Sequence, residues 1–248
     1  MNLVITMAGR SERFRQAGFN IPKWRISVND KLMLYYALKP FLQFNGLVVF
    51  VSLKSEEAKS EIETICSDLQ ISHYLIREVE EILMGQAASV EAAIDLLPQG
   101  QPFAVWNIDT IFLGQFEKVM PKGGFWLTLT NLEGDMWSFA KISNFRVVEV
   151  AEKIPISKDS SIGLYGFPNP ESFLEAYKVV YSEKYVERYV APLYNYWIKH
   201  GYVVLPNFVH PQQIIPIGTP QQLFKAWQVG LITLDNKSLD LLKYYFDK

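Results

Sequence analysis

Five basic side chains that follow the first apolar segment of the chain could bind an anion. They are Arg10, Arg13, Arg15, Lys23 and Arg25. The net charge of the chain is −2, so this positive charge is local. The apolar segment ends at Gly9, and a strand that ends in a small-residue loop can bring backbone N–H groups close to an anion. We therefore hypothesise a triphosphate-binding loop. A solvated loop without a ligand stays the alternative, because neither the dinucleotide fingerprint nor the P-loop motif is present.

Two acidic side chains also follow apolar segments. Asp109 comes after residues 103–106, and Glu152 comes after residues 147–150. Ligands in open α/β sheets bind beyond the carboxyl ends of the strands. Mg²⁺ prefers oxygen ligands and often takes only one or two carboxylates beside substrate phosphates, which makes Asp109 the candidate metal ligand. The alternative is that Asp109 caps the turn after its strand.

The composition is that of a folded chain. Of its 248 residues, 49% are hydrophobic and 14% aromatic, which supplies a core and excludes a disordered protein. The net charge argues against bulk binding of nucleic acid. No stretch reaches the roughly 18 apolar residues of a membrane span, and the single cysteine, Cys66, fits a reducing compartment. We expect a cytoplasmic protein that binds neither nucleic acid nor membrane.

The order of the apolar segments predicts how the charged groups are positioned. In the first half, buried strands are expected at residues 3–6, 46–52, 73–76 and 103–106. Helices are expected between them, at residues 31–39, 55–69 and 84–97. Strands that alternate with helices favour a mainly parallel sheet with right-handed crossovers.

In the second half of the chain, the expected strands no longer alternate regularly with helices. Strands are expected at residues 125–130, 139–142, 147–150, 162–167 and 202–205, of which 139–142 and 147–150 are expected as antiparallel additions. Helices are expected at residues 172–181, 189–200 and 220–230, and from about residue 235. No internal repeat or charge-rich linker interrupts the chain. We expect a single domain over residues 1–248.

Residues 7–14 read Met-Ala-Gly-Arg-Ser-Glu-Arg-Phe, and Pro22 and Lys23 follow them. This segment resembles the signature loop of the sugar-phosphate nucleotidyltransferases, or nucleotide-sugar pyrophosphorylases. Further segments resemble that family in the same order along the chain. They are residues 85–90, 107–109, 150–153, 162–165 and 218–220. The matches cover nearly the whole chain. The resemblance implies an α/β, Rossmann-like three-layer nucleotidyltransferase fold, in which a mixed, mainly parallel sheet is flanked by helices.

The resemblance also assigns roles to side chains. The residues it implies for nucleotide binding are Ala8, Gly9, Arg10, Ser11, Gly85, Gln86 and Asn107, with Gln86 facing the base. Those implied for acceptor binding are Glu152, Lys153 and Gly163. The implied catalytic residues are Arg13, Lys23, Asp109 and Lys153. Asp109 would bind Mg²⁺, Arg13 would contact the β- and γ-phosphates, and Lys23 the α-phosphate.

On the acceptor side, the resemblance implies that Glu152 contacts hydroxyl groups, Lys153 contacts the phosphate, and Gly163 leaves room for the ring. The implied activity is Mg²⁺-dependent. A nucleoside triphosphate joins a sugar phosphate or a similar small phosphorylated acceptor, and pyrophosphate is released, usually for surface polysaccharide precursors. The nucleotide-binding half is expected at about 1–115 and the acceptor-binding half at about 116–248. The sequence is also compatible with an oligomer.

Two positions depart from the family pattern. Glu12 lies where the family loop usually has glycine, and Pro216 lies where many members have a second metal-binding aspartate. A catalytically silent relative that binds nucleotide or sugar is therefore one alternative. A glycosyltransferase of related fold is another. Arg13 and Lys23 argue against it, because an enzyme that uses a finished nucleotide-sugar releases no pyrophosphate.

Overall fold

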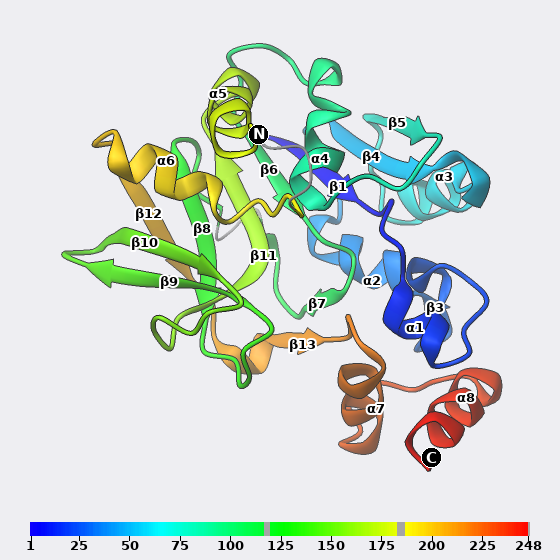
Figure 1. Ribbon diagram of the computed structural model, residues 1–248. Helices are drawn as coiled ribbons and strands as arrows, with labels where there is room; N and C mark the ends of the chain where they lie inside the picture. Colours follow the sequence, from blue (N-terminus) through cyan, green and yellow to red (C-terminus); the bar gives the residue numbers. More distant parts are fainter. Residues whose placement is uncertain (117–119, 183–186, 248) are drawn as a thin grey trace.

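The computed structural model describes residues 1–116, 120–182 and 187–247 (Figure 1). The central sheet of this described chain has nine strands, which are β1 (Asn2–Thr6), β4 (Val48–Leu53), β5 (Tyr74–Val79), β6 (Phe103–Trp106), β8 (Phe125–Thr130), β9 (Ser138–Ser143), β10 (Arg146–Glu152), β11 (Ser160–Phe167) and β12 (Val204–Phe208). They pair in the order β10-β9-β11-β6-β1-β4-β5, with β8 beside β11 and β12 beside β8. The sheet is mixed, and the predicted α/β fold class is confirmed.

The strand β1 lies at the centre of the parallel half of the sheet. It pairs in parallel with β4 on one side and with β6 on the other, and β4 pairs in parallel with β5. Every residue of β4 and β6 is buried, as expected for parallel strands that are covered on both faces. The crossovers contain α2 (Met33–Leu38), α3 (Lys59–Asp68) and α4 (Gln86–Glu91). The carboxyl ends of β1 and β6 therefore lie side by side.

Alternate residues of β1 face two different cores. Val4 belongs to a core that it shares with α4, α5 (Pro170–Val180) and α6 (Leu193–Lys199). Leu3 and Ile5 belong to a second core, which contains residues of α2 and α3. This alternation follows from the two-residue period of a strand. The sheet thus lies between two helical layers, as Figure 1 shows.

The second half of the sheet is built around β11. This strand pairs antiparallel with β6, β8 and β9, and β9 pairs antiparallel with β10. The prediction of antiparallel additions at residues 139–142 and 147–150 is therefore confirmed. β10 continues to Glu152, two residues beyond its expected end. The strand β12 returns to lie parallel beside β8.

The C-terminal helices pack against the N-terminal segment. The helices α1 (Glu12–Gln16), α7 (Pro220–Gln228) and α8 (Asn236–Phe246) contribute to a third core. Phe14 contacts Phe19 edge to face, with 5.5 Å between the ring centroids. Both are buried in this core with Leu223 and Leu242. Beside it, β7 (Thr110–Phe112) pairs with β13 (Ile214–Pro216). The arginine-rich segment is therefore held in place by the end of the chain.

Several helix boundaries differ from the sequence-based prediction. Residues 12–16 were expected to lie in a loop, but they form α1 because Phe14 is drawn into the third core. The helix expected at residues 31–39 begins only at Met33, because Lys31 and Leu32 form β3 (Lys31–Leu32), which pairs with β2 (Ser27–Val28). The helix expected at 189–200 begins at Leu193.

Two further predicted helices are interrupted. The helix expected at residues 55–69 divides into η3 (Lys54–Glu56) and α3, because Glu57 adopts a left-handed conformation with φ 46°. The helix expected at residues 84–97 divides into α4 and η4 (Ile94–Leu96). The described residues also form the 3-10 turns η1 (Lys23–Arg25), η2 (Lys39–Phe41) and η6 (Pro211–Gln213). Within the described ranges, no helix has the length and apolar character of a membrane span.

Candidate active site

Two adjoining cavities lie at the carboxyl ends of β1 and β6. The larger has a volume of about 590 Å³ and the smaller a volume of about 180 Å³. Both are lined by Gln86, Asn107, Asp109 and Tyr189, so the cavities meet at these side chains. We call this place the junction. The carboxyl ends of strands are where open α/β sheets bind their ligands.

Residues 6–10 form one wall of the larger cavity. Ala8 is buried, whereas no described atom lies within 4 Å of the position that a Cβ on Gly9 would take. The backbone at Gly9 is therefore open to a ligand. Of the predicted nucleotide-binding residues, those that line this cavity in the described chain are Ala8, Gly9, Arg10, Gly85, Gln86 and Asn107. Ser11 contributes through another contact.

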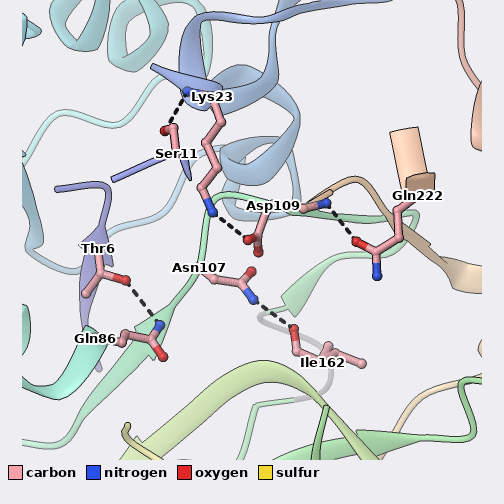
Figure 2. A network of polar contacts seen from close by, with 9 residues as sticks. Thr6, Ser11, Lys23, Gln86, Asn107, Asp109, Ile162 and Gln222 are labelled. Carbon is pink, nitrogen blue, oxygen red and sulfur yellow. Dashed lines mark hydrogen bonds and ion pairs between the residues drawn. The ribbon is translucent and has the colours of Figure 1, made fainter. Parts of the chain in front are cut away.

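That contact involves Lys23, which lies at the junction. Its Nζ lies 2.6 Å from Oδ2 of Asp109, and the two side chains are 22% and 24% exposed (Figure 2). Ser11 Oγ accepts a hydrogen bond of 3.0 Å from the backbone N–H of Lys23. Ser11 precedes α1 in a left-handed conformation with φ 53°. The N-terminal segment thus places the partly exposed ammonium of Lys23 against the carboxylate of Asp109, which follows β6.

Gln86 is held in one orientation at the start of α4. Its Nε2 donates a hydrogen bond of 3.1 Å to Oγ1 of Thr6, the last residue of β1 (Figure 2). This bond directs the amide nitrogen to the strand and leaves Oε1 to the cavities that Gln86 lines. An amide that is fixed in this way can distinguish a hydrogen-bond donor from an acceptor on a ligand.

Asp109 provides the carboxylate that could hold a metal ion. Pro216, which occupies the place of a second aspartate, lies in β13 opposite Thr110 and supplies no side-chain ligand. Across the part of the chain that the structure describes, no group of three or more His, Cys, Asp or Glu side chains could hold a metal ion. Asn107 Oδ1 is buried there without a hydrogen-bond partner. This donor set fits Mg²⁺ whose remaining ligands are phosphate oxygens and water.

Two glycines make room for the side chains of the junction. A Cβ at Gly163, where φ is +88°, would lie 2.0 Å from Nδ2 of Asn107. A Cβ at Gly218 would lie 2.8 Å from Oδ2 of Asp109. Asn107 Nδ2 donates to the backbone oxygen of Ile162 at 3.4 Å (Figure 2). Gly163 therefore gives space to Asn107, and its predicted contact with an acceptor ring stays a prediction.

The smaller cavity contains a hydrogen-bonded carboxylate. Ser138 Oγ donates to Oε2 of the half-buried Glu152 and lies 3.2 Å from the hydroxyl of Tyr165. Burial raises the pKa of the Glu152 carboxyl, and it raises the pKa of Tyr165 to about 12. Tyr165 therefore stays protonated at neutral pH. These groups can exchange hydrogen bonds with the hydroxyls of a small ligand.

Arg13 and Lys153 lie away from the larger cavity. Arg13 lines the smaller cavity. Lys153 is not among the described residues that line either cavity, and its Nζ donates a hydrogen bond of 2.7 Å to the hydroxyl of Tyr189. The assigned contacts of Arg13 with the β- and γ-phosphates and of Lys153 with the acceptor phosphate stay predictions.

The whole fold is shared with a nucleoside-diphosphate-sugar pyrophosphorylase from Vibrio cholerae RC9. The TM-score is 0.83 at 28% sequence identity, over 91% of this chain and 99% of that chain. The resemblance of this chain to the sugar-phosphate nucleotidyltransferases is therefore confirmed. No family model and no curated protein matches the sequence.

Two other solved structures share the nucleotidyltransferase fold at lower identity. The inositol-1-phosphate CTP transferase from T. maritima has a TM-score of 0.73 at 13% identity, over 98% of this chain and 95% of that chain. A protein from Bacillus anthracis in complex with a sucrose, assigned as a glucose-1-phosphate thymidylyltransferase, has a TM-score of 0.74 at 18% identity. It is matched over 97% of this chain and 99% of that chain. At these identities the likeness concerns the fold.

The candidate site also contains side chains that the sequence analysis did not assign to it. Trp137 and Gln222 line the smaller cavity, and Tyr189 lines both cavities. The sequence held a signal for Tyr189, because tyrosine recurs every four residues at positions 177, 181, 185 and 189. Position 185 lies outside the described residues. Trp137 and Gln222 carried no comparable signal, although Gln222 closely follows the family-like segment at residues 218–220.

Proposed function

We propose that this nucleotidyltransferase uses Mg²⁺ to join a nucleoside triphosphate to a sugar phosphate or a similar small phosphorylated acceptor, with release of pyrophosphate. The observation that carries this proposal is the contact between Lys23 and Asp109 at the junction. A cation and a carboxylate between two cavities suit a reaction that brings two phosphorylated molecules together. The larger cavity takes the nucleotide in this proposal, and the smaller takes the acceptor.

The reaction requires positioning and charge neutralisation more than a general base. The phosphate oxygen of the acceptor is ionised at pH 7 and is already a nucleophile. The barrier arises because two polyanions must approach in line at the α-phosphorus. Lys23 and Arg13 line the two cavities with positive charge that is in place before the substrates arrive. Loss of either cation is expected to lower the rate by about 10²–10³-fold.

Asp109 is the protein group that would hold Mg²⁺, and the unpartnered Oδ1 of Asn107 is an oxygen close to the same junction. When it is bound, the ion supplies Lewis-acid stabilisation of negative charge on phosphate oxygens. In the free protein Lys23 neutralises Asp109. A triphosphate in the larger cavity gives Lys23 a second anionic partner and frees Oδ2. Lys23 therefore binds carboxylate and phosphate in turn.

We also propose that the enzyme is a single-domain protein of the cytoplasm. Its product in this proposal is a precursor of surface polysaccharide. The single cysteine, Cys66, is free and buried, which is consistent with a reducing compartment, where disulfides are rare.

Pyrophosphate release tests the proposed reaction directly. Purified protein is mixed with each common ribonucleoside triphosphate or dTTP, with Mg²⁺, and with a panel of hexose 1-phosphates and inositol 1-phosphate. The expected result is pyrophosphate from at least one pair, abolished by a chelator of divalent ions. Binding of nucleotide without turnover would instead identify a silent relative. Turnover of a finished nucleotide-sugar would identify a glycosyltransferase.

A matched pair of lysine variants tests the role of the junction. Lys23→Met removes the cation that contacts Asp109. Lys31→Met removes a surface lysine that pairs with Asp68 at 2.9 Å, with 51% of its side chain exposed. Pyrophosphate release should fall about 10²-fold or more in the first variant and stay at the wild-type rate in the second. Equal rates in both variants would exclude Lys23 from the reaction.

A further inference from the structure

The backbone of Arg188 and Tyr189 links the second half of the chain to the loop before α4. The N–H of Arg188 donates to the oxygen of Met84 at 2.7 Å, and the N–H of Ala87 donates to the oxygen of Arg188 at 2.8 Å. The hydroxyl of Tyr181 donates to the backbone oxygen of Tyr189 at 2.5 Å. These hydrogen bonds fix the backbone that carries the Tyr189 side chain.

The close approach of this segment requires glycine at position 85. A Cβ on Gly85 would lie 2.6 Å from the backbone oxygen of Arg188, and φ at Gly85 is +105°. The glycine that precedes Gln86 thus allows the two segments to touch. Tyr189 is consequently held next to the wall of the larger cavity while it also lines the smaller one.

The side chain of Tyr189 holds the ammonium of Lys153. Lys153 Nζ lies 2.7 Å from the hydroxyl oxygen and 4.5 Å from the centre of the ring. The hydroxyl donates its own proton to Oε2 of Glu187, which leaves an oxygen lone pair for Lys153. Burial raises the pKa of the Tyr189 hydroxyl, so it keeps this proton at neutral pH. Tyr189 is therefore oriented as an acceptor for the lysine.

Lys153 keeps its positive charge available for an anion. None of the ion pairs formed within the described ranges includes Lys153. Its backbone has a left-handed φ of 55°, and its N–H donates to the oxygen of Trp137 at 2.9 Å. The Lys153 ammonium contacts a neutral hydroxyl and the face of an aromatic ring. It can therefore bind a phosphate without first breaking an ion pair with a carboxylate.

We propose that Tyr189 is a positioning residue of the transfer reaction, which holds the Lys153 ammonium beside the junction for the phosphate of the acceptor. This inference rests on the proposed function. Tyr189 acts through Lys153, so its hydroxyl affects the acceptor and not the nucleotide. The ring of Tyr189 has a separate, steric role as a wall of both cavities.

The variant Tyr189→Phe tests this inference, because it keeps the ring and removes the hydroxyl. With the acceptor and triphosphate that give the highest wild-type rate in the panel, the KM for the acceptor should rise roughly 10-fold, the effect of losing one hydrogen bond to a charged group. The KM for the nucleotide should stay within about twofold of the wild-type value, since the ring is kept. The control is Tyr196→Phe, which loses a bond of 2.9 Å to Glu175 outside both cavities and should change neither KM.

A double-mutant cycle separates positioning from a direct contact. The acceptor KM of Tyr189→Phe combined with Lys153→Ala should equal that of Lys153→Ala alone, because the hydroxyl then has no lysine to hold. An equal rise of KM in both backgrounds would overturn the inference, and so would an unchanged acceptor KM in Tyr189→Phe. A wild-type enzyme that releases no pyrophosphate with any acceptor overturns the proposed function, and the inference falls with it.

Discussion

Lys23 and Asp109 lie 86 positions apart in the sequence, and 2.6 Å separates Nζ from Oδ2. Asp109 lies beyond the carboxyl end of β6, an interior strand of the sheet, and the third core holds the segment that contains Lys23. Both side chains are largely covered, so the cost of desolvation offsets much of the attraction, and the ion pair is weak evidence for stability. Its consequence is electrostatic, since it places one charge of each sign where the two cavities meet.

The first prediction concerns the carboxylate of this pair. Asp109→Asn keeps the size of the side chain and removes the negative charge that would hold Mg²⁺. Pyrophosphate release should fall by about 10²–10³-fold or more, while the protein stays folded, because asparagine keeps the shape of the side chain. Steady-state kinetics and a thermal melt measure the two quantities. Asp68→Asn breaks a surface lysine pair of 2.9 Å and serves as the control. Near-normal turnover of Asp109→Asn would refute the assignment.

The second prediction concerns Gly163. In Gly163→Ala the new Cβ would lie 2.0 Å from Nδ2 of Asn107, and φ is +88°. The variant should lose about 1–3 kcal/mol of unfolding free energy, and Asn107 should move and reduce turnover. Gly201→Ala has a similar φ of +79° with no described atom within 4 Å, so it isolates the backbone strain. Equal stability and full activity of both variants in a denaturant titration and a turnover assay would disprove the clash.

Continuous apolar runs let the sequence predict the sheet. The strands at residues 103–106 and 125–130 match β6 and β8 at both ends, and every residue of both strands is buried. The ordered motifs also predicted that Gly9, Gln86 and Asp109 come together, and the structure places all three around the larger cavity. The apolar segments and the local motifs were therefore enough to predict this part of the site.

Contacts between distant side chains could not be predicted in this way. The five-residue α1 exists because Phe14 is buried with Leu242, which is a property of the end of the chain. The same helix carries Arg13 to the smaller cavity. Lys153 meets Tyr189 because the backbone of Arg188 pairs with the loop at Met84. The tyrosine repeat singles out Tyr189 in the sequence but does not indicate Lys153 as its partner.

The third prediction concerns the choice of base. Thr6→Val removes the oxygen that accepts the 3.1 Å hydrogen bond from Nε2 of Gln86 and nearly conserves the shape of the side chain. The amide of Gln86 is then free to present either its oxygen or its nitrogen to the larger cavity. The ratio of kcat/KM between the preferred and the next triphosphate should fall, by a few-fold up to about 10-fold, the effect of one neutral hydrogen bond. An unchanged ratio would show that Gln86 does not read the base.

The last prediction concerns pH and the buried Glu56, which lies behind η1. Trp24 Nε1 donates a hydrogen bond of 2.7 Å to its Oε2. Burial raises the pKa of this carboxyl above its ordinary value of 4.5, and this effect outweighs the Trp24 bond and the nearby Arg25 charge. The folded state therefore binds a proton more tightly than the unfolded state. The contribution of Glu56 to the unfolding free energy falls as the pH rises from 4.5 through the raised pKa.

Glu56→Gln separates this effect from the hydrogen bond. Glutamine keeps an oxygen that can accept from Trp24, and it removes the group that titrates. The unfolding free energy of the variant minus that of the wild type should increase between pH 4 and pH 7, because only the wild type must bury an ionised carboxylate at the higher pH. Denaturant titrations at several pH values measure this difference. A difference that is constant with pH would mean that Glu56 has the same pKa in the folded and unfolded protein, and that its burial carries no electrostatic cost.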